Sequence, residues 1–345
     1  MTQRDKAAHA LAIDLGGTKC SAAVIDRKGK ILARRSVPVD VGTRLGPVSQ
    51  IVELAKEHAA GKNPAAAYVG VGVAVPGLVR RDGSVWAPNL PGWEKMPLAK
   101  HLSRSLGLRV EVESDRNAAV LGEMWLGAAR GKSDAIVLMI GTGIGAGMLS
   151  GGRIVRGAHE LSGCAGWLTI TRENVQAAQG CGELESLAAG PGIARSAQQR
   201  LKNGEDSSLR NLDHSKISAH DVAAAARSGD ALAIDVFNRA GRFLGYGIAN
   251  LVSILDPEVI VIGGGMAAVA DLYIAPLKQA MLERAQPLAA EKVKIVVSKM
   301  ADTVNLLGCA RMVWQPLTSQ HESSATRASA RIPRKKRSRT HKEKS

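Results

Sequence analysis

Two segments of the chain repeat the same order of elements, and this repetition constrains the fold more than any other feature. In each segment an apolar run predicted as a strand leads into a turn that contains Gly and Thr. A second apolar run, a glycine-containing turn and a third predicted strand follow. The first unit covers residues 11–38 and the second covers residues 135–155. Two related units of this kind predict an internally duplicated α/β chain, with a nucleotide in the cleft between the halves.

The remaining elements divide this α/β chain into two expected domains. We predict an N-terminal tail over 1–10, a smaller α/β domain over 11–115 and a larger one over 116–302. A last helix, at about 303–316, would pack back on the smaller domain, and 317–345 would form a basic disordered tail. Within the domains, apolar spacing predicts further elements: helices over 48–60, 98–106, 117–126 and 305–313, and strands over 68–75, 108–112, 135–140, 259–262 and 293–297.

The net charge of +15 looks at first like a signal for nucleic-acid binding. Residues 317–345, however, hold nine basic and two acidic residues, which is a net +7 with almost no large apolar side chains. Such a segment is expected to be disordered and solvated. Contact with nucleic acid is therefore predicted only through this tail, and a solvated tail is the favoured interpretation. Over the whole chain, 45% apolar and 22% charged residues indicate a globular protein.

Cysteine usage and hydropathy indicate a cytoplasmic protein without a membrane span. The four cysteines have no paired spacing, which fits a reducing compartment. The N-terminal ten residues lack an apolar run of the length that a signal peptide needs. No stretch approaches the roughly 20 apolar residues of a transmembrane helix.

The first glycine turn has the composition needed to hold phosphate. Gly16 and Gly17 allow the backbone N–H groups to approach an anion, Thr18 adds a hydroxyl donor, and Lys19 adds positive charge. Asp14, at the end of the preceding strand, could hold Mg²⁺ directly or through water. An ordinary hairpin turn with a surface lysine is an equally good interpretation. The turn is not a Walker-type loop, because no helix follows it.

Two further glycine-rich turns follow buried strands. Gly141, Thr142 and Gly143 fit a backbone nest around phosphate, and Gly264 and Gly265 fit an open shelf for adenosine. Each turn alone is a weak signal, because a tight turn or a close backbone approach explains it as well. Three such turns at three strand ends match the needs of one nucleotide, namely two phosphate loops and one adenosine shelf.

Two polar positions are candidates for contact with the phosphate acceptor. Asp115 lies between a strand and a helix, where it could serve as a helix N-cap or as a general base for an attacking hydroxyl. Asn89, in the segment PNLPGW, offers a donor and acceptors for vicinal sugar hydroxyls. A Pro-Gly turn with a buried Trp93 explains the same segment and is compatible with sugar binding.

Over residues 10–315 the chain resembles the repressor–ORF–kinase (ROK) family, which includes bacterial glucokinases. The resemblance rests on six segments in order: LAIDLGGTK, VGVAVPGLV, PNLPGW, VESDRNAAVLGE, IGTGIGAGMLSGGRIVRGAHELSG and NLVSILDPEVIVIGGG. It implies a two-domain ribonuclease H/actin-like fold, ATP and Mg²⁺ as cofactors, and a sugar as substrate. Asp115 would be the base and Asn89 a sugar ligand. The three glycine turns would hold Mg·ATP, and Glu185 looks like the sugar-binding Glu of the family.

The sugar and zinc motif of the family is degenerate in this chain. Where the family usually has Gly-Glu-x-Gly-His, the matching stretch is Gly-Cys-Ala-Gly-Trp, so that Cys164 replaces the Glu and Trp167 the zinc-binding His. The following loop, 176–183, keeps only Cys181. A tetrahedral zinc site needs about four N or S ligands, and we therefore predict no structural zinc. Trp167 could stack on a sugar or fill the space left by zinc.

The resemblance leaves more than one function open. The leading hypothesis is an ATP-dependent kinase that transfers the γ-phosphate to a hexose hydroxyl, in a homodimer that is expected from the resemblance alone. A catalytically weak sugar sensor or partner-binding protein is the alternative, because the sugar motif is altered. A transcription regulator is disfavoured, because only ten residues precede Leu11, too few for a helix-turn-helix domain.

Overall fold

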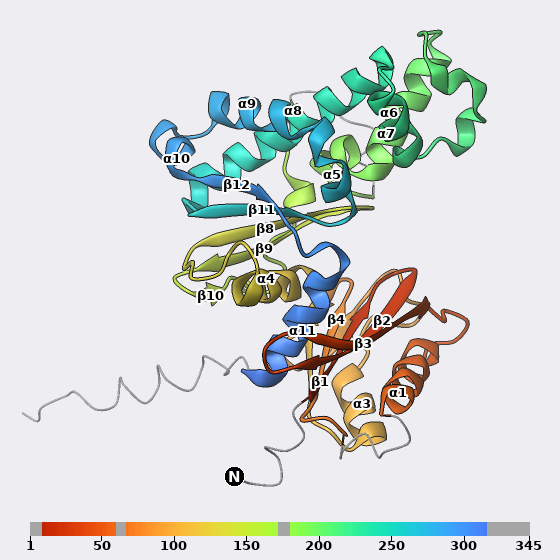
Figure 1. Cartoon of the computed structure of the whole chain (residues 1–345), viewed down its shortest axis with the longest axis vertical. Coiled ribbons are helices and arrows are strands. Elements are labelled where there is room, and N and C mark those ends of the chain that lie inside the picture. The colour runs from red at the N-terminus through yellow and green to blue at the C-terminus, as the bar shows by residue number, and fades with distance from the viewer. Residues whose placement is uncertain (1–8, 60–66, 172–179, 316–345) are drawn as a thin grey trace, which may run out of the picture.

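Two five-stranded sheets, one above the other in Figure 1, organise the molecule. The computed structural model describes residues 9–59, 67–171 and 180–315. The expected basic tail, most of the expected N-terminal tail and much of the degenerate zinc loop lie outside these residues, so the predictions made for them stay predictions. No helix among the described residues is long and apolar enough to cross a membrane.

The first sheet has the strand order β3-β2-β1-β4-β7. Its strands are β1 (His9–Leu15), β2 (Lys19–Asp26), β3 (Ile31–Pro38), β4 (Val71–Val75) and β7 (Val110–Ser114). The first three are antiparallel, whereas β1, β4 and β7 run parallel. Helices α1 (Gly46–His58) and α3 (Leu98–Leu106) accompany this sheet, as does a two-stranded hairpin of β5 (Leu78–Val79) and β6 (Val85–Trp86).

The second sheet repeats this arrangement in the order β10-β9-β8-β11-β12. Its strands are β8 (Ala135–Ile140), β9 (Ile144–Ser150), β10 (Arg153–Ile154), β11 (Val259–Gly263) and β12 (Lys294–Val297). Again three antiparallel strands are followed by two parallel ones. The identical topology of the two sheets confirms the duplication predicted from the sequence.

Most helices belong to the second sheet and lie beyond it, away from the first sheet (Figure 1). They are α5 (Glu183–Ala188), α6 (Gly190–Lys202), α7 (Ala219–Arg227), α8 (Ala231–Leu255), α9 (Ile274–Arg284) and α10 (Pro287–Lys292). Short 3₁₀ helices are η2 (Ala165–Trp167), η4 (Ser208–Asn211), η5 (His214–Lys216), η6 (Gly265–Leu272) and η7 (Ala301–Thr303). The apolar core between sheet and helices includes the fully buried Phe237 and Tyr273.

Two helices, α4 (Asp115–Leu126) and α11 (Val304–Trp314), lie side by side between the sheets (Figure 1). Glycines allow their backbones to meet. A Cβ at Gly308 would lie 1.8 Å from the carbonyl oxygen of Ala118, and one at Gly122 would lie 2.3 Å from that of Val304. Cys309 donates its S–H to the carbonyl of Ile13 in β1 at 3.2 Å. The last helix thus packs on the first sheet although it follows the second.

The boundary between β7 and α4 differs from the prediction. The predicted strand ended at residue 112 and the predicted helix began at 117, whereas β7 continues to Ser114 and α4 begins at Asp115. In the structure, Glu113 and Ser114 pair with β4 and are buried, because their polar groups find partners within the fold.

Candidate active site

The first glycine turn closes tightly between β1 and β2. Gly16 donates its N–H to the carbonyl of Lys19 at 2.8 Å, and a Cβ at Gly16 would lie 3.1 Å from that oxygen. Gly17, Thr18 and Lys19 are exposed at the tip of the turn. The Nζ of Lys19 lies 3.6 Å from Asp302, which also binds Arg34 (Nη1 to Oδ1, 3.1 Å). The exposed tip is accessible to an anion.

The fold brings two of the predicted site residues, Asp14 and Asp115, close together. In the first sheet Asp14 pairs with Ala74, and Ala74 pairs with Glu113, two residues before Asp115. Burial is the largest cause that raises the pKa of Asp14, the hydrogen bond from Asn305 lowers it and the negative charge of Asp115 raises it, and the resulting pKa is about 6. Both carboxyl groups therefore lie at the carboxyl ends of parallel strands, where open α/β sheets bind their ligands.

Asp115 is the first residue of α4, and Ser114 occupies the N-cap position. The Oδ1 of Asp115 accepts a hydrogen bond from the backbone N–H of Arg116 at 2.7 Å. Burial raises the pKa of the Asp115 carboxyl, although the bond from Arg116 and its positive charge act in the opposite direction. The hydrogen bond from Arg116 to Oδ1 fixes the orientation of the Asp115 carboxyl.

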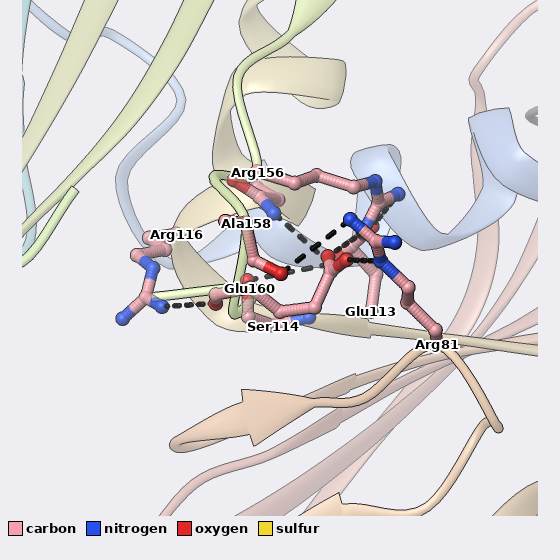
Figure 2. Close-up of polar contacts among 8 residues, drawn as sticks. Arg81, Glu113, Ser114, Arg116, Arg156, Ala158 and Glu160 are labelled. Carbon is pink, nitrogen blue, oxygen red and sulfur yellow. Dashed lines mark hydrogen bonds and ion pairs between the residues drawn. The ribbon is translucent and has the colours of Figure 1, made fainter. Parts of the chain in front are cut away.

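A network of charged side chains surrounds the segment that precedes Asp115 (Figure 2). Glu113 accepts hydrogen bonds from the backbone N–H of Ser114 (2.8 Å) and from the Asn117 amide (3.0 Å), and it pairs with Arg156. Arg156 lies 3.8 Å from Glu160, and Arg81 donates from Nε to Glu160 at 3.2 Å. The sequence reasoning missed Arg81, Arg156 and Glu160. The spacing of Arg156 and Glu160 was a weak signal for a pair, but nothing local pointed to Arg81.

The side chain of Glu185 binds the backbone of the second glycine turn. Gly141 donates its N–H to the carbonyl of Gly143 at 2.9 Å, and the N–H of Ile144 donates to Oε2 of Glu185 at 2.7 Å. A Cβ at Gly143 would lie 2.8 Å from this Oε2, so that only glycine fits without a shift. Thr142 is exposed at the tip. One oxygen of Glu185, predicted as a sugar ligand, thus binds the glycine turn itself.

The third glycine turn lies beside the second. Gly264 has a φ of +80°, and a Cβ there would lie 2.4 Å from the carbonyl oxygen of Ile140. At Gly265, by contrast, a Cβ would meet nothing within 4 Å, and the N–H of Gly265 lies 3.9 Å from the Cβ position of Gly141. The open space beside Gly265 is compatible with the predicted shelf for adenosine.

The predicted sugar ligands lie at different places around the turns. Asn89 is exposed, and its Nδ2 lies 3.8 Å from the Cβ position of Gly17 in the first turn. Trp93 is fully buried and donates from Nε1 to the carbonyl of Arg44 at 2.9 Å. Trp167 is 64% exposed, which disfavours the idea that it fills an internal space. Cys164 is exposed as well.

The sequence pattern that describes the ROK family matches residues 10–315. The chain belongs to the ROK family. It is 31% identical to the glucokinase of Halalkalibacterium halodurans over 327 residues, which cover 92% of this chain and 98% of that one. A ROK family glucokinase from Streptomyces griseus, solved in complex with glucose and AMPPNP, has a TM-score of 0.72 and 28% identity over 88% of this chain and 98% of that chain.

ROK proteins of another kind are similar to this chain as well. A ROK family transcriptional regulator, a homologue of the E. coli MLC protein, has a TM-score of 0.80 and 26% identity over 89% of this chain and 78% of that chain. The predicted family and the two-domain ribonuclease H/actin-like fold are confirmed. At the level of the family, these likenesses support a sugar phosphotransferase, within a group that also contains regulators.

Proposed function

We propose that this ROK protein is an ATP-dependent sugar kinase, which transfers the γ-phosphate of ATP to a hexose hydroxyl with Asp115 as general base. The observation that carries the proposal is the approach of Asp14 and Asp115 at the strand ends of the first sheet, so that the charge of one raises the pKa of the other. Phosphoryl transfer to a hydroxyl requires one group that binds a metal ion and another that accepts a proton, and two carboxyl groups can serve these two roles.

The residues around Asp14 fit a magnesium ion. Asp14 is a partly buried carboxylate that accepts one hydrogen bond, from Nδ2 of Asn305 at 3.2 Å. The other amide atom of Asn305, Oδ1, is buried and has no hydrogen-bond partner among the described residues. Oxygen atoms of this kind suit Mg²⁺ or the water molecules that it retains. When bound with ATP, the ion would neutralise phosphate charge.

The chain's own groups account for the remaining tasks. The exposed backbone N–H groups of the first and second glycine turns would orient the phosphates, and Lys19 would add a positive charge after leaving Asp302. Asp115 would accept the proton of the attacking hydroxyl, with its carboxyl oriented by the hydrogen bond from the backbone of Arg116. A raised pKa makes this carboxylate a better proton acceptor than an exposed aspartate.

The sugar remains the open part of this proposal. Glucose, bound by the S. griseus relative, is the first candidate. Asn89 lies beside the first turn, and Trp167 is exposed and free to stack on a sugar face. Cys164 lacks the charge of the Glu that the family has at this position, which is expected to weaken binding of ordinary glucose. A different hexose, an N-acetylhexosamine or a polyol would fit such a change.

The test is a coupled ADP-release assay with Mg·ATP over a panel of hexoses, N-acetylhexosamines and polyols. We expect turnover with at least one sugar in the wild-type chain and loss of at least about 100-fold in Asp115→Asn, since general-base catalysis contributes this much. A folded protein that binds AMPPNP but turns over no sugar would contradict the proposal.

A sugar sensor without turnover is the second candidate. The altered Cys164 and Trp167 favour it, as does the likeness to the ROK regulator. Calorimetry separates the two, because a sensor binds sugar tightly without producing ADP. Homodimerisation, a cytoplasmic location and any contact of the basic tail with nucleic acid stay predictions.

A further inference from the structure

Four charged side chains form a compact group across the boundary between the two domains (Figure 2). Arg81, in the turn between β5 and β6, and Glu113, in β7, belong to the domain of the first sheet. Arg156 and Glu160 follow β10 of the second sheet. Arg81 pairs with Glu160 at 3.2 Å, and Arg156 pairs with Glu113. Each domain thus contributes one cation and one anion, and we call these four residues the clasp.

Burial makes the clasp more consequential than a surface ion pair. The side chains of Glu160 and Glu113 are only 11% and 2% exposed, whereas those of their partners Arg81 and Arg156 are 61% and 34% exposed. A carboxylate in such surroundings is costly unless it is paired and hydrogen-bonded. Because each carboxylate finds its main cationic partner on the other domain, separation of the domains would leave both without that partner.

The backbone of Glu160 has an unusual conformation that its contacts hold in place. Its φ is +61°, in the left-handed region that is unfavourable for a residue with a side chain. The carbonyl of Glu160 accepts a hydrogen bond from Arg116 at 3.4 Å, and the neighbouring carbonyl of Ala158 accepts one from Arg81 at 3.4 Å. Conformations of this kind persist where the surroundings hold them, and they concentrate at functional sites.

The clasp is connected directly to the proposed base. Glu113 binds both the N–H of Ser114 and the amide of Asn117, the residues on either side of Asp115 and Arg116. Arg116, the next residue after Asp115, reaches the carbonyl of Glu160. The segment that holds Arg156 and Glu160 also continues into Cys164 and Trp167. Charges from both domains therefore hold the first turn of α4 and the start of the altered sugar loop together.

We propose that Arg81 and Glu160 are positioning residues, which hold the two domains in the arrangement of this structure and thereby hold Asp115 against the sugar. The inference rests on the proposed function. Since the clasp lies at Asp115 and the loop of Cys164, and no clasp residue is part of a glycine turn, its loss should weaken the sugar step more than the binding of Mg·ATP.

The experiment uses neutral variants, Arg81→Gln, Glu160→Gln and the double variant, with Arg81→Lys as the conservative change. A charge swap is unsuitable, because an arginine at 160 would face Arg156 at the 3.8 Å site. We expect each Gln variant to raise KM for the sugar roughly tenfold, as loss of about 1.4 kcal/mol implies, and to raise KM for Mg·ATP by less. The double variant should be no worse than the more affected single variant, and Arg81→Lys should restore most of the loss.

The matched control is the exposed pair Arg227–Asp271, which lies within the second domain. Arg227→Gln and Asp271→Asn should leave both KM values unchanged. Additive effects of the two clasp substitutions, equal effects on sugar and ATP, or no effect on KM in folded variants would each overturn the proposal.

A second measurement separates this proposal from the proposed function. Small-angle scattering of the full chain reports domain closure without any turnover. If the wild-type chain phosphorylates no sugar, the function fails, but a larger radius of gyration in Arg81→Gln and Glu160→Gln than in the wild type still supports the clasp. A radius unchanged in both variants overturns the clasp, whatever the kinase assay gives.

Discussion

The amide of Asn305 donates a 3.2 Å hydrogen bond to the carboxyl of Asp14, across 291 residues of sequence. Asn305 lies in α11, the last helix, and Asp14 lies at the end of β1. The bond opposes the effect of burial on the pKa of Asp14, but burial prevails and the pKa is raised to about 6. The chain therefore carries a carboxylate whose charge is destabilising until a cation binds.

Asp14→Asn is expected to stabilise the protein in the absence of Mg·ATP, in a pH-dependent manner. A pKa raised from 3.8 to about 6 means that the folded state holds the proton more tightly than the unfolded state. The cost of the charge is absent below pH 3.8, grows up to about pH 6 and is complete above it. The variant should gain up to about 3 kcal/mol in the free energy of unfolding at pH 8, and only a small fraction of this at pH 4. Urea denaturation at the two pH values measures this.

Asp206→Asn is the control for this prediction, because its side chain is 97% exposed. An equal gain for Asp14→Asn at pH 4 and pH 8 would show that the charge of Asp14 is not the cause. The same variant should lose binding of Mg·AMPPNP, measured by calorimetry, if Asp14 holds the ion.

Asp230 should show the opposite pH dependence. Burial alone would raise its pKa, but hydrogen bonds from the N–H groups of Ala233 and Ser208 and from two serine hydroxyls outweigh burial and lower the pKa to about 2. Its contribution is complete above pH 3.8 and is lost as the pH falls toward 2. Asp230→Asn should therefore cost about 2 kcal/mol at pH 7 and progressively less below pH 3.8.

Guanidinium denaturation between pH 7 and pH 2.5 tests this second prediction. Asp256→Asn, at the other end of α8, is the matched control and should show no comparable loss. A cost for Asp230→Asn that stays constant over the pH range would be inconsistent with the lowered pKa.

The glycines of the second and third turns should respond differently to alanine. A methyl group at Gly143 would displace the carboxylate of Glu185 from the N–H of Ile144, at a cost of about 1 kcal/mol for the lost hydrogen bond. At Gly265 the methyl group meets open space. Gly143→Ala should therefore lower Tm, whereas Gly265→Ala should leave Tm unchanged and raise KM for ATP if adenosine lies there. Equal Tm losses would contradict the open space beside Gly265.

Restoring a carboxylate at Cys164 should improve binding of glucose. Cys164 is exposed, and the resemblance to the family predicts a sugar-binding Glu at this position. A charge-assisted hydrogen bond is worth about 1.5–3 kcal/mol, so Cys164→Glu should lower Kd for glucose by roughly ten- to a hundred-fold in calorimetry. Cys164→Ser, polar but uncharged, is the control. An unchanged affinity in the Glu variant would mean that position 164 does not contact the sugar.

Local patterns in the sequence were sufficient for the elements and for the candidate residues on the glycine turns. The strand over Ala135–Ile140 and the helix over Leu98–Leu106 have the predicted bounds, because apolar spacing and flanking glycines act within a few residues. The repeated strand–turn–strand units likewise determined the duplicated sheets. Local patterns of this kind also indicated Asp14 and Asp115 as candidate site residues, each on its own, although their roles stay proposals.

Only the tertiary structure decided which of these residues meet, and with what partners. Asn305 reaches Asp14 because α11 returns to the first sheet, and Arg81 reaches Glu160 because the β5–β6 hairpin faces the second domain. Glu185 supports the second glycine turn although it was predicted as a sugar ligand. Such contacts join residues tens to hundreds of positions apart, and no local periodicity encodes them. They arise from the packing of the two sheets around α4 and α11, which determines the charge and geometry around Asp115.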